Sequence, residues 1–152
     1  MENKIVKNII QISAPIEKVW AVLTESAYTK IYMFGCEVIS IWKVGSPLLW
    51  KMKHVGQDFI PVKGEILAMD YPKLLKYSVI DPHASYPDIL ANYLNVTYSL
   101  SDNKEETTLT ITQDGFEGVA EEEKRYKDIY NNGEGWMPIL VQIKDLAEKE
   151  LD

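Results

Sequence analysis

The sequence is poor in the residues that build covalent and metal sites. Its 152 residues include one cysteine and two histidines. A single cysteine cannot form an internal disulfide or a multi-cysteine metal site, so we expect Cys36 to pack as a small apolar side chain. No apolar run approaches the ~20 residues of a membrane-spanning helix, and no signal-peptide core follows Met1. We therefore expect a cytoplasmic protein without a metal or another cofactor.

Positive charge is also scarce. The chain has 16 Lys and Arg against 23 Asp and Glu, which gives a net charge of −7. An acidic chain repels phosphate backbones and anionic lipid heads, so we expect no nucleic-acid partner and no membrane partner. The hydrophobic fraction of 46% and charged fraction of 26% are those of an ordinary globular protein. The length suits one domain over residues 1–152.

The aromatic content is the unusual part of the composition. There are four Trp and nine Tyr but only three Phe. Trp and Tyr carry a polar atom that needs a hydrogen-bond partner when the ring is buried. A cavity that contains a few polar groups can supply such partners, so the surplus favours a pocket.

Hydrophobic periodicity predicts an α+β fold. A short helix begins near Pro15 and a second begins at Ser26, and the remaining segments mostly alternate with period two. Short turns rich in Gly, Pro, Asp and Asn separate these segments, which indicates an antiparallel meander. Pro61 indicates an edge or bulge in its strand. The predicted strands are 4–12, 36–42, 48–54, 58–69, 74–80, 93–100 and 107–113.

Helical periodicity returns over residues 119–151. Only this segment is long enough to cover the apolar face of the sheet, which predicts a curved antiparallel sheet of six to seven strands wrapped around a long C-terminal helix. Pro138 removes one helical hydrogen bond and crowds the carbonyl of Glu134, so we predict a kink there; a complete break is the alternative.

The sequence resembles the START-like (SRPBCC, helix-grip) superfamily, and within it the family named for the activator of the heat-shock-protein-90 ATPase. The resemblance implies a deep cavity between the sheet and the long helix that holds a small apolar or amphipathic molecule. It implies no single reaction, because lipid carriers, hormone receptors and polyketide cyclases share the fold. The matching residues are 13–20, 44–47, 50–51, 64–74, 96–100, 107–112 and 135–136, followed by Leu140 and Lys144.

The predicted ligand-binding residues are amphipathic side chains whose register points toward this cavity. Ordinary core packing is the alternative for each single ring. We assign no catalytic residue, because no nucleophilic triad or phosphate-binding loop is present. Asp81, His83 and Asp88 suit a turn better than a metal site. The ligand-binding set is Tyr28, Tyr32, Trp50, Met52, His54, Tyr77, Tyr98, Trp136 and Leu140.

We therefore expect a protein that binds a small hydrophobic or amphipathic ligand. The alternatives are an enzyme of the polyketide cyclase or hydratase type and a protein-interaction module related to chaperone regulation. Co-chaperones of the resembled family carry an additional domain ahead of the matching part, for which these 152 residues have no room. A homodimer stays open.

Overall fold

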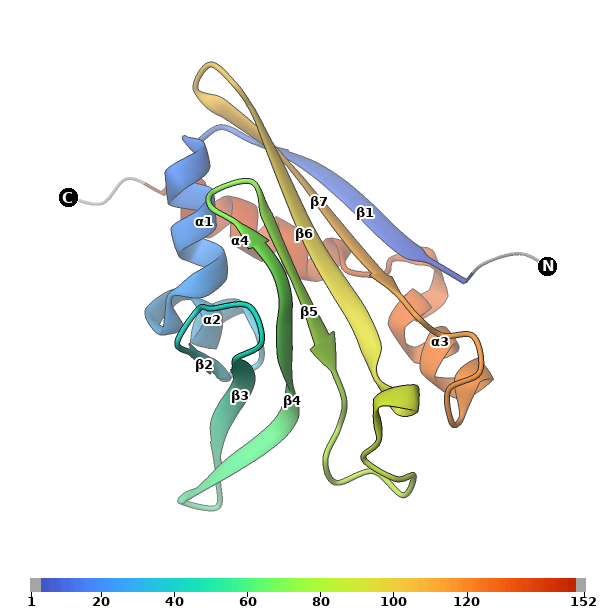
Figure 1. Cartoon of the computed structure of the whole chain (residues 1–152). Coiled ribbons are helices and arrows are strands. Elements are labelled where there is room, and N and C mark those ends of the chain that lie inside the picture. The colour runs from blue at the N-terminus through green and yellow to red at the C-terminus, as the bar shows by residue number, and fades with distance from the viewer. Residues whose placement is uncertain (1–3, 150–152) are drawn as a thin grey trace.

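The computed structural model describes residues 4–149 and contains one seven-stranded antiparallel sheet with helices against one face (Figure 1). The strand order is β1-β7-β6-β5-β4-β3-β2, a meander in which the first strand pairs with the last. The strands are β1 (Val6–Ile12), β2 (Glu37–Ser40), β3 (Pro47–His54), β4 (Gln57–Asp70), β5 (Leu74–Val79), β6 (Leu94–Asn103) and β7 (Glu106–Asp114). Each of the seven predicted strands is therefore confirmed, with ends displaced by a few residues.

The long strand β4 is irregular at two places. Its pairing with β3 shifts between Trp50 and Met52, opposite the segment that contains Pro61. Its pairing with β5 shifts again between Ile66 and Ala68. Bulges bend a strand and increase its twist, so these two sites help to curve the sheet around the helices. The predicted irregularity near Pro61 is confirmed.

Helices α1 (Ile16–Thr24) and α2 (Ser26–Tyr32) follow β1, as the sequence predicts. A further helix, α4 (Met137–Glu148), lies behind the sheet between α1 and α3 (Glu122–Tyr130) (Figure 1). It buries Leu140, Ile143 and Ala147 in the main core. The alternating inward side chains of β5, β6 and β7 form the other side of this core. The predicted helix-grip arrangement is confirmed.

The predicted kink at Pro138 is wrong, and the alternative of a complete break is what the structure has, although the break lies between α3 and α4 rather than at Pro138. Asn131, Asn132, Gly133 and Gly135 all have positive φ angles, a conformation that Gly adopts freely and that Asn tolerates. Pro138 is not the cause. It lies in the first turn of α4, where its missing N–H removes no helical hydrogen bond. The part of the prediction over residues 150–151 lies outside the described residues.

No helix within residues 4–149 has both the length and the apolar character needed to cross a bilayer.

Candidate functional site

A cavity of about 500 Å³ lies between the inner face of the sheet and the broken C-terminal segment. The volume is in the range of small-molecule sites. Side chains from β3, β4, β5, β6 and β7 line one side, and residues from α3 to the start of α4 line the other. Most of these side chains are apolar, so the site is suited to an apolar molecule.

The floor of the cavity is one row of directly paired residues. Tyr77 on β5 pairs with Val96 on β6, and Val96 pairs with Gln113 on β7. Residues that pair across a sheet point to the same face, and all three line the cavity. Val79, two residues after Tyr77, extends the floor along β5.

The opposite wall depends on the break in the C-terminal segment. Ile129 from α3, and Trp136, Pro138 and Ile139 around the start of α4, line the cavity from this side. The Nε1–H of Trp136 donates a hydrogen bond of 2.9 Å to Oε1 of Gln113. The indole ring is therefore tied to the floor.

Asn8 on β1 fixes the backbone of the segment between the helices. Its Oδ1 accepts a hydrogen bond of 2.8 Å from the N–H of Trp136, and its Nδ2 donates one of 3.0 Å to the carbonyl of Glu134. A Cβ atom added to Gly135 would lie 2.4 Å from the same Oδ1. Because residue 135 also has a left-handed backbone (φ +54°), any other residue there would be strained and would push the Asn8 side chain away.

Four aromatic rings run through the site from β3 to the start of α4. The ring centroids are 6.4 Å apart for Trp50 and Tyr77, 5.4 Å for Tyr77 and Tyr98, and 6.3 Å for Tyr98 and Trp136. The two phenol oxygens lie 2.6 Å apart in a hydrogen bond. Burial raises the pKa of Tyr77 and of Tyr98 above the ordinary value, so both hydroxyls stay neutral.

The mouth of the cavity includes the segment after α2. Met33, Phe34 and Cys36 line it, and Phe34 is 75% exposed. Burial raises the pKa of the Cys36 thiol, which disfavours the thiolate that a nucleophilic cysteine needs. Cys36 is buried, as the sequence predicts.

Trp50, Met52, Tyr77 and Trp136 are the members of the predicted ligand-binding set that line the cavity. Tyr98 lies directly behind Tyr77. Whether any of these residues contacts a ligand stays a prediction.

The other four predicted residues do not line the cavity. Tyr32 is buried and its hydroxyl donates to the carbonyl of Leu23, and Leu140 lies in the core under α4. The Tyr28 hydroxyl accepts a hydrogen bond from Lys18. His54 lies exposed at the end of β3, beside the ring of Phe59.

Gln113 is the most informative residue that sequence reasoning missed. The inward register of Leu109 and Ile111 continues to Gln113 with period two, so the signal was present. The same alternation with period two places Val96 on the inward face of β6, together with Tyr98. In contrast, no periodicity brings Asn8 next to Trp136, because their contact joins residues 128 positions apart.

The turn residues Asp81, His83 and Asp88 contact other protein groups rather than one another's metal-binding atoms. Asp81 accepts a hydrogen bond from the backbone N–H of His83, and Asp88 pairs with Lys63 and Tyr93. The ring of His83 stacks on Phe59. No group of three or more His, Cys, Asp and Glu side chains within the described residues is arranged to hold a metal ion.

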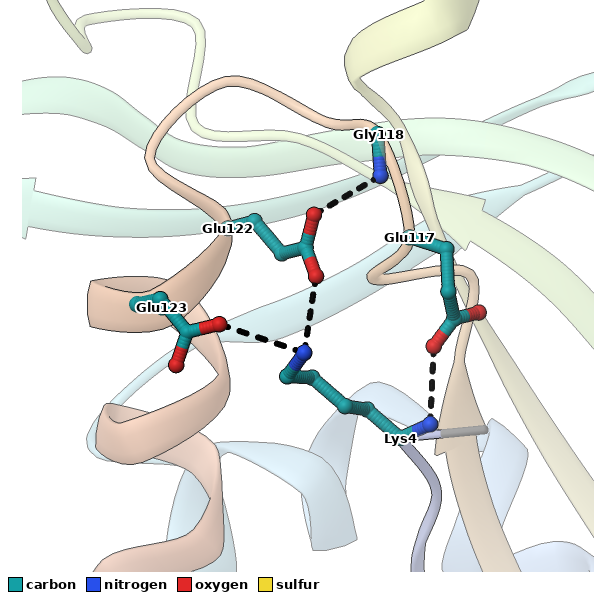
Figure 2. Close-up of polar contacts among 5 residues, drawn as sticks. All are labelled: Lys4, Glu117, Gly118, Glu122 and Glu123. Atoms are coloured by element: carbon teal, nitrogen blue, oxygen red, sulfur yellow. Dashed lines mark hydrogen bonds and ion pairs between the residues drawn. The ribbon is translucent and has the colours of Figure 1, made fainter. Parts of the chain in front are cut away.

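An ion cluster holds the start of α3 against β1 (Figure 2). The Lys4 ammonium lies 2.8 Å from Glu122 and 3.2 Å from Glu123, and its backbone N–H donates to Glu117. Glu122 also accepts a hydrogen bond from the N–H of Gly118. These polar contacts hold the first turn of α3, while Tyr126 and Ile129 further along the helix pack on a small apolar cluster that includes Phe116.

The family model described as "Activator of Hsp90 ATPase homolog 1-like protein" matches residues 13–148. The chain belongs to this family. A protein from Cytophaga hutchinsonii with a known solution structure is 36% identical, with a TM-score of 0.67, over 95% of this chain and 99% of that chain. The predicted resemblance to this family is thus confirmed.

Two of the similar structures are described as Aha1 or as an HSP90 activator. The Aha1 dimer from Colwellia psychrerythraea is 16% identical, with a TM-score of 0.65, over 95% of this chain and 96% of that chain. An HSP90 activator from Plasmodium falciparum is 15% identical, with a TM-score of 0.61, over 85% of this chain and 89% of that chain. At these identities the similarity is one of fold. A search of curated proteins found no match.

Asn8→Ala should loosen the segment that carries Trp136. Two hydrogen bonds are lost, which predicts a decrease in the free energy of unfolding of about 1–3 kcal/mol and faster hydrogen exchange of the Trp136 amide. Asn8→Asp is the matched control, because it keeps the acceptor for that amide. Equal exchange rates at Trp136 in both variants would contradict the assignment.

The Lys4 cluster predicts a pH-dependent contribution to stability. The pKa of Glu122 is lowered mainly by the hydrogen bond that its carboxylate accepts from Lys4, and next by the one that it accepts from the N–H of Gly118. A carboxyl group with a depressed pKa stabilises the fold above its unfolded pKa of about 4.3, and this contribution is lost as the pH falls through the folded value. The stability difference between wild type and Lys4→Met should therefore be present at pH 6 and shrink toward pH 3.

Urea unfolding at each pH measures this difference. Lys124→Met is the matched control, since Lys124 forms an exposed pair with Asp128, and exposed pairs contribute little. A difference between wild type and Lys4→Met that stays constant down to pH 2.5 would show that Glu122 is not the partner responsible.

Proposed function

We propose that this chain binds a small, mainly apolar molecule in the cavity between the sheet and the segment from α3 to α4. The observation that carries the proposal is the size and apolar lining of this cavity. Its volume is about 500 Å³, and its walls include Trp50, Val79, Val96 and Ile139. Protein cores are normally packed without spaces of this size. An apolar ligand would restore the lost packing contacts and gain about 25 cal/mol for each Å² of apolar surface buried.

The chemistry of the lining favours binding over catalysis. The ionisable side chains among the described lining residues are Cys36, Tyr77 and Asp128. Burial raises the pKa of the first two, so neither is a base near neutral pH. His54, a histidine of the predicted ligand-binding set, does not line the cavity. A carrier or receptor is therefore better supported than a cyclase or hydratase.

Val79→Phe should block binding, because the added ring would occupy the floor. The probe is N-phenyl-1-naphthylamine, a neutral apolar fluorophore whose emission rises on transfer from water. We expect saturable binding to the wild type and an affinity at least about tenfold lower for Val79→Phe. Val44→Phe is the matched control, because Val44 is 64% exposed and outside the cavity.

Circular dichroism melts must first show that both variants are folded. Equal affinities for wild type and Val79→Phe would place the fluorophore elsewhere on the chain. The absence of saturable binding to the wild type would argue against the proposal itself.

Membership of the family supports a second candidate, an interaction with an Hsp90-type chaperone. One similar structure is described as an HSP90 activator. If this candidate is correct, an immobilised Hsp90 middle domain should retain the purified chain in proportion to its concentration. A chain that passes through unretained at tens of micromolar would retire the candidate.

The Aha1 dimer structure supports a homodimer as a further proposal. A sedimentation coefficient that stays at the value of a monomer up to 100 µM would exclude it.

A further inference from the structure

Gln113 is a buried side chain of the cavity with an uncommitted hydrogen-bond donor. It is only 4% exposed, it lies on the floor, and its Oε1 accepts from Trp136 Nε1. An indole N–H can only donate, so this bond fixes the orientation of the amide. The Nε2 group is therefore turned away from Trp136.

The Nε2 group of Gln113 makes no hydrogen bond to any residue in the described range 4–149. Within that range, no completely buried side-chain nitrogen or oxygen atom lacks a partner. Nε2 is thus not sealed inside the core, and the space open to this side chain is the cavity that it lines. A molecule that fills the cavity without an acceptor at this point would bury the donor unpaired, which is unfavourable.

The neighbouring polar groups are already engaged. The Tyr77 and Tyr98 hydroxyls share one hydrogen bond, in which either oxygen can be the donor, and the Trp136 Nε1–H is bonded to Gln113 itself. Asn131 and Asp128 belong to the end of α3 and are exposed. Gln113 is therefore the buried amide donor that a ligand meets at the floor, beside the Tyr77 hydroxyl.

The charge of the lining restricts the acceptor further. No Lys or Arg side chain of the described residues lines the cavity, and the carboxylate of Asp128 near its rim is paired with Lys124. Burying a ligand carboxylate without a cation is strongly unfavourable. An uncharged oxygen has a much smaller desolvation cost.

We infer that the ligand carries an uncharged acceptor oxygen, such as that of a ketone, ester or amide, which accepts from Nε2 of Gln113. Its apolar body then lies on Val79 and Val96 below Ile139. This inference rests on the proposed function and names the class of molecule that the same cavity selects.

Three naphthalenes of nearly equal shape test the inference by isothermal titration calorimetry. They are 2-acetylnaphthalene, 2-isopropenylnaphthalene, in which a CH₂ group replaces the oxygen, and 2-naphthoate, in which a charged carboxylate replaces the acetyl group. We expect the carboxylate at pH 8 to bind at least about tenfold more weakly than the ketone.

Gln113→Leu keeps the size of the side chain and removes the donor. We expect the ratio of ketone affinity to alkene affinity to fall roughly three- to tenfold in this variant. Trp136→Phe removes the bond that orients the Gln113 amide but leaves the amide itself in place. It should weaken both ligands through lost contact, and it should lower the affinity ratio less than Gln113→Leu does, because the donor is still present.

A second measurement needs no variant and therefore decides the case if Gln113→Leu does not fold. In wild-type protein labelled with ¹⁵N, the side-chain amide signals of Gln113 should shift with the ketone and much less with the alkene. An unchanged affinity ratio in folded Gln113→Leu, equal amide shifts with both ligands, or a carboxylate that binds as tightly as the ketone would overturn the inference. If none of the three compounds binds, the proposed function fails and takes this inference with it.

Discussion

The hydrogen bonds between Asn8 and the backbone at Glu134 and Trp136 are the contact on which the site depends most. They join the first strand to the segment between the last two helices, next to Gly135, whose left-handed backbone and missing Cβ leave room for the Asn8 amide. A continuous helix could not place its backbone against Asn8 in this way, because its N–H and C=O groups would bond to one another. The break therefore lets the segment approach β1, carries Trp136 to Gln113, and leaves the floor of the sheet uncovered beside it.

The large features of the fold follow from local rules that act on particular residues. Alternation of apolar and polar side chains located several of the strands, and Pro61 marked the bulge in β4. The break could have been read from Asn131 to Gly135, where left-handed backbone is favoured. Pro138 was given too much weight because its effect depends on whether it lies inside a helix or in the first turn.

The site was harder to predict than the fold. An aromatic or methionine side chain on an inward register becomes part of either the packed core or the cavity wall. The cavity wall contains Trp50, Met52, Tyr77 and Trp136. Periodicity cannot separate these two outcomes, and Tyr32 and Leu140 are core. Periodicity also cannot tell where a strand extends beyond the covered part of the sheet. His54 has the inward register of Trp50 and Met52, but it lies at the exposed end of β3. Contacts between distant residues, such as Asn8 with Trp136, need the tertiary structure.

The central claim is that the space between the floor and the broken segment is a ligand site. The most direct measurement is a crystal structure of the chain grown with N-phenyl-1-naphthylamine. The account predicts electron density for the fluorophore against Val79 and Val96, with Trp136 still bonded to Gln113. Density for the fluorophore only on the outer surface, with the side chains of α4 packed down into the space, would contradict it.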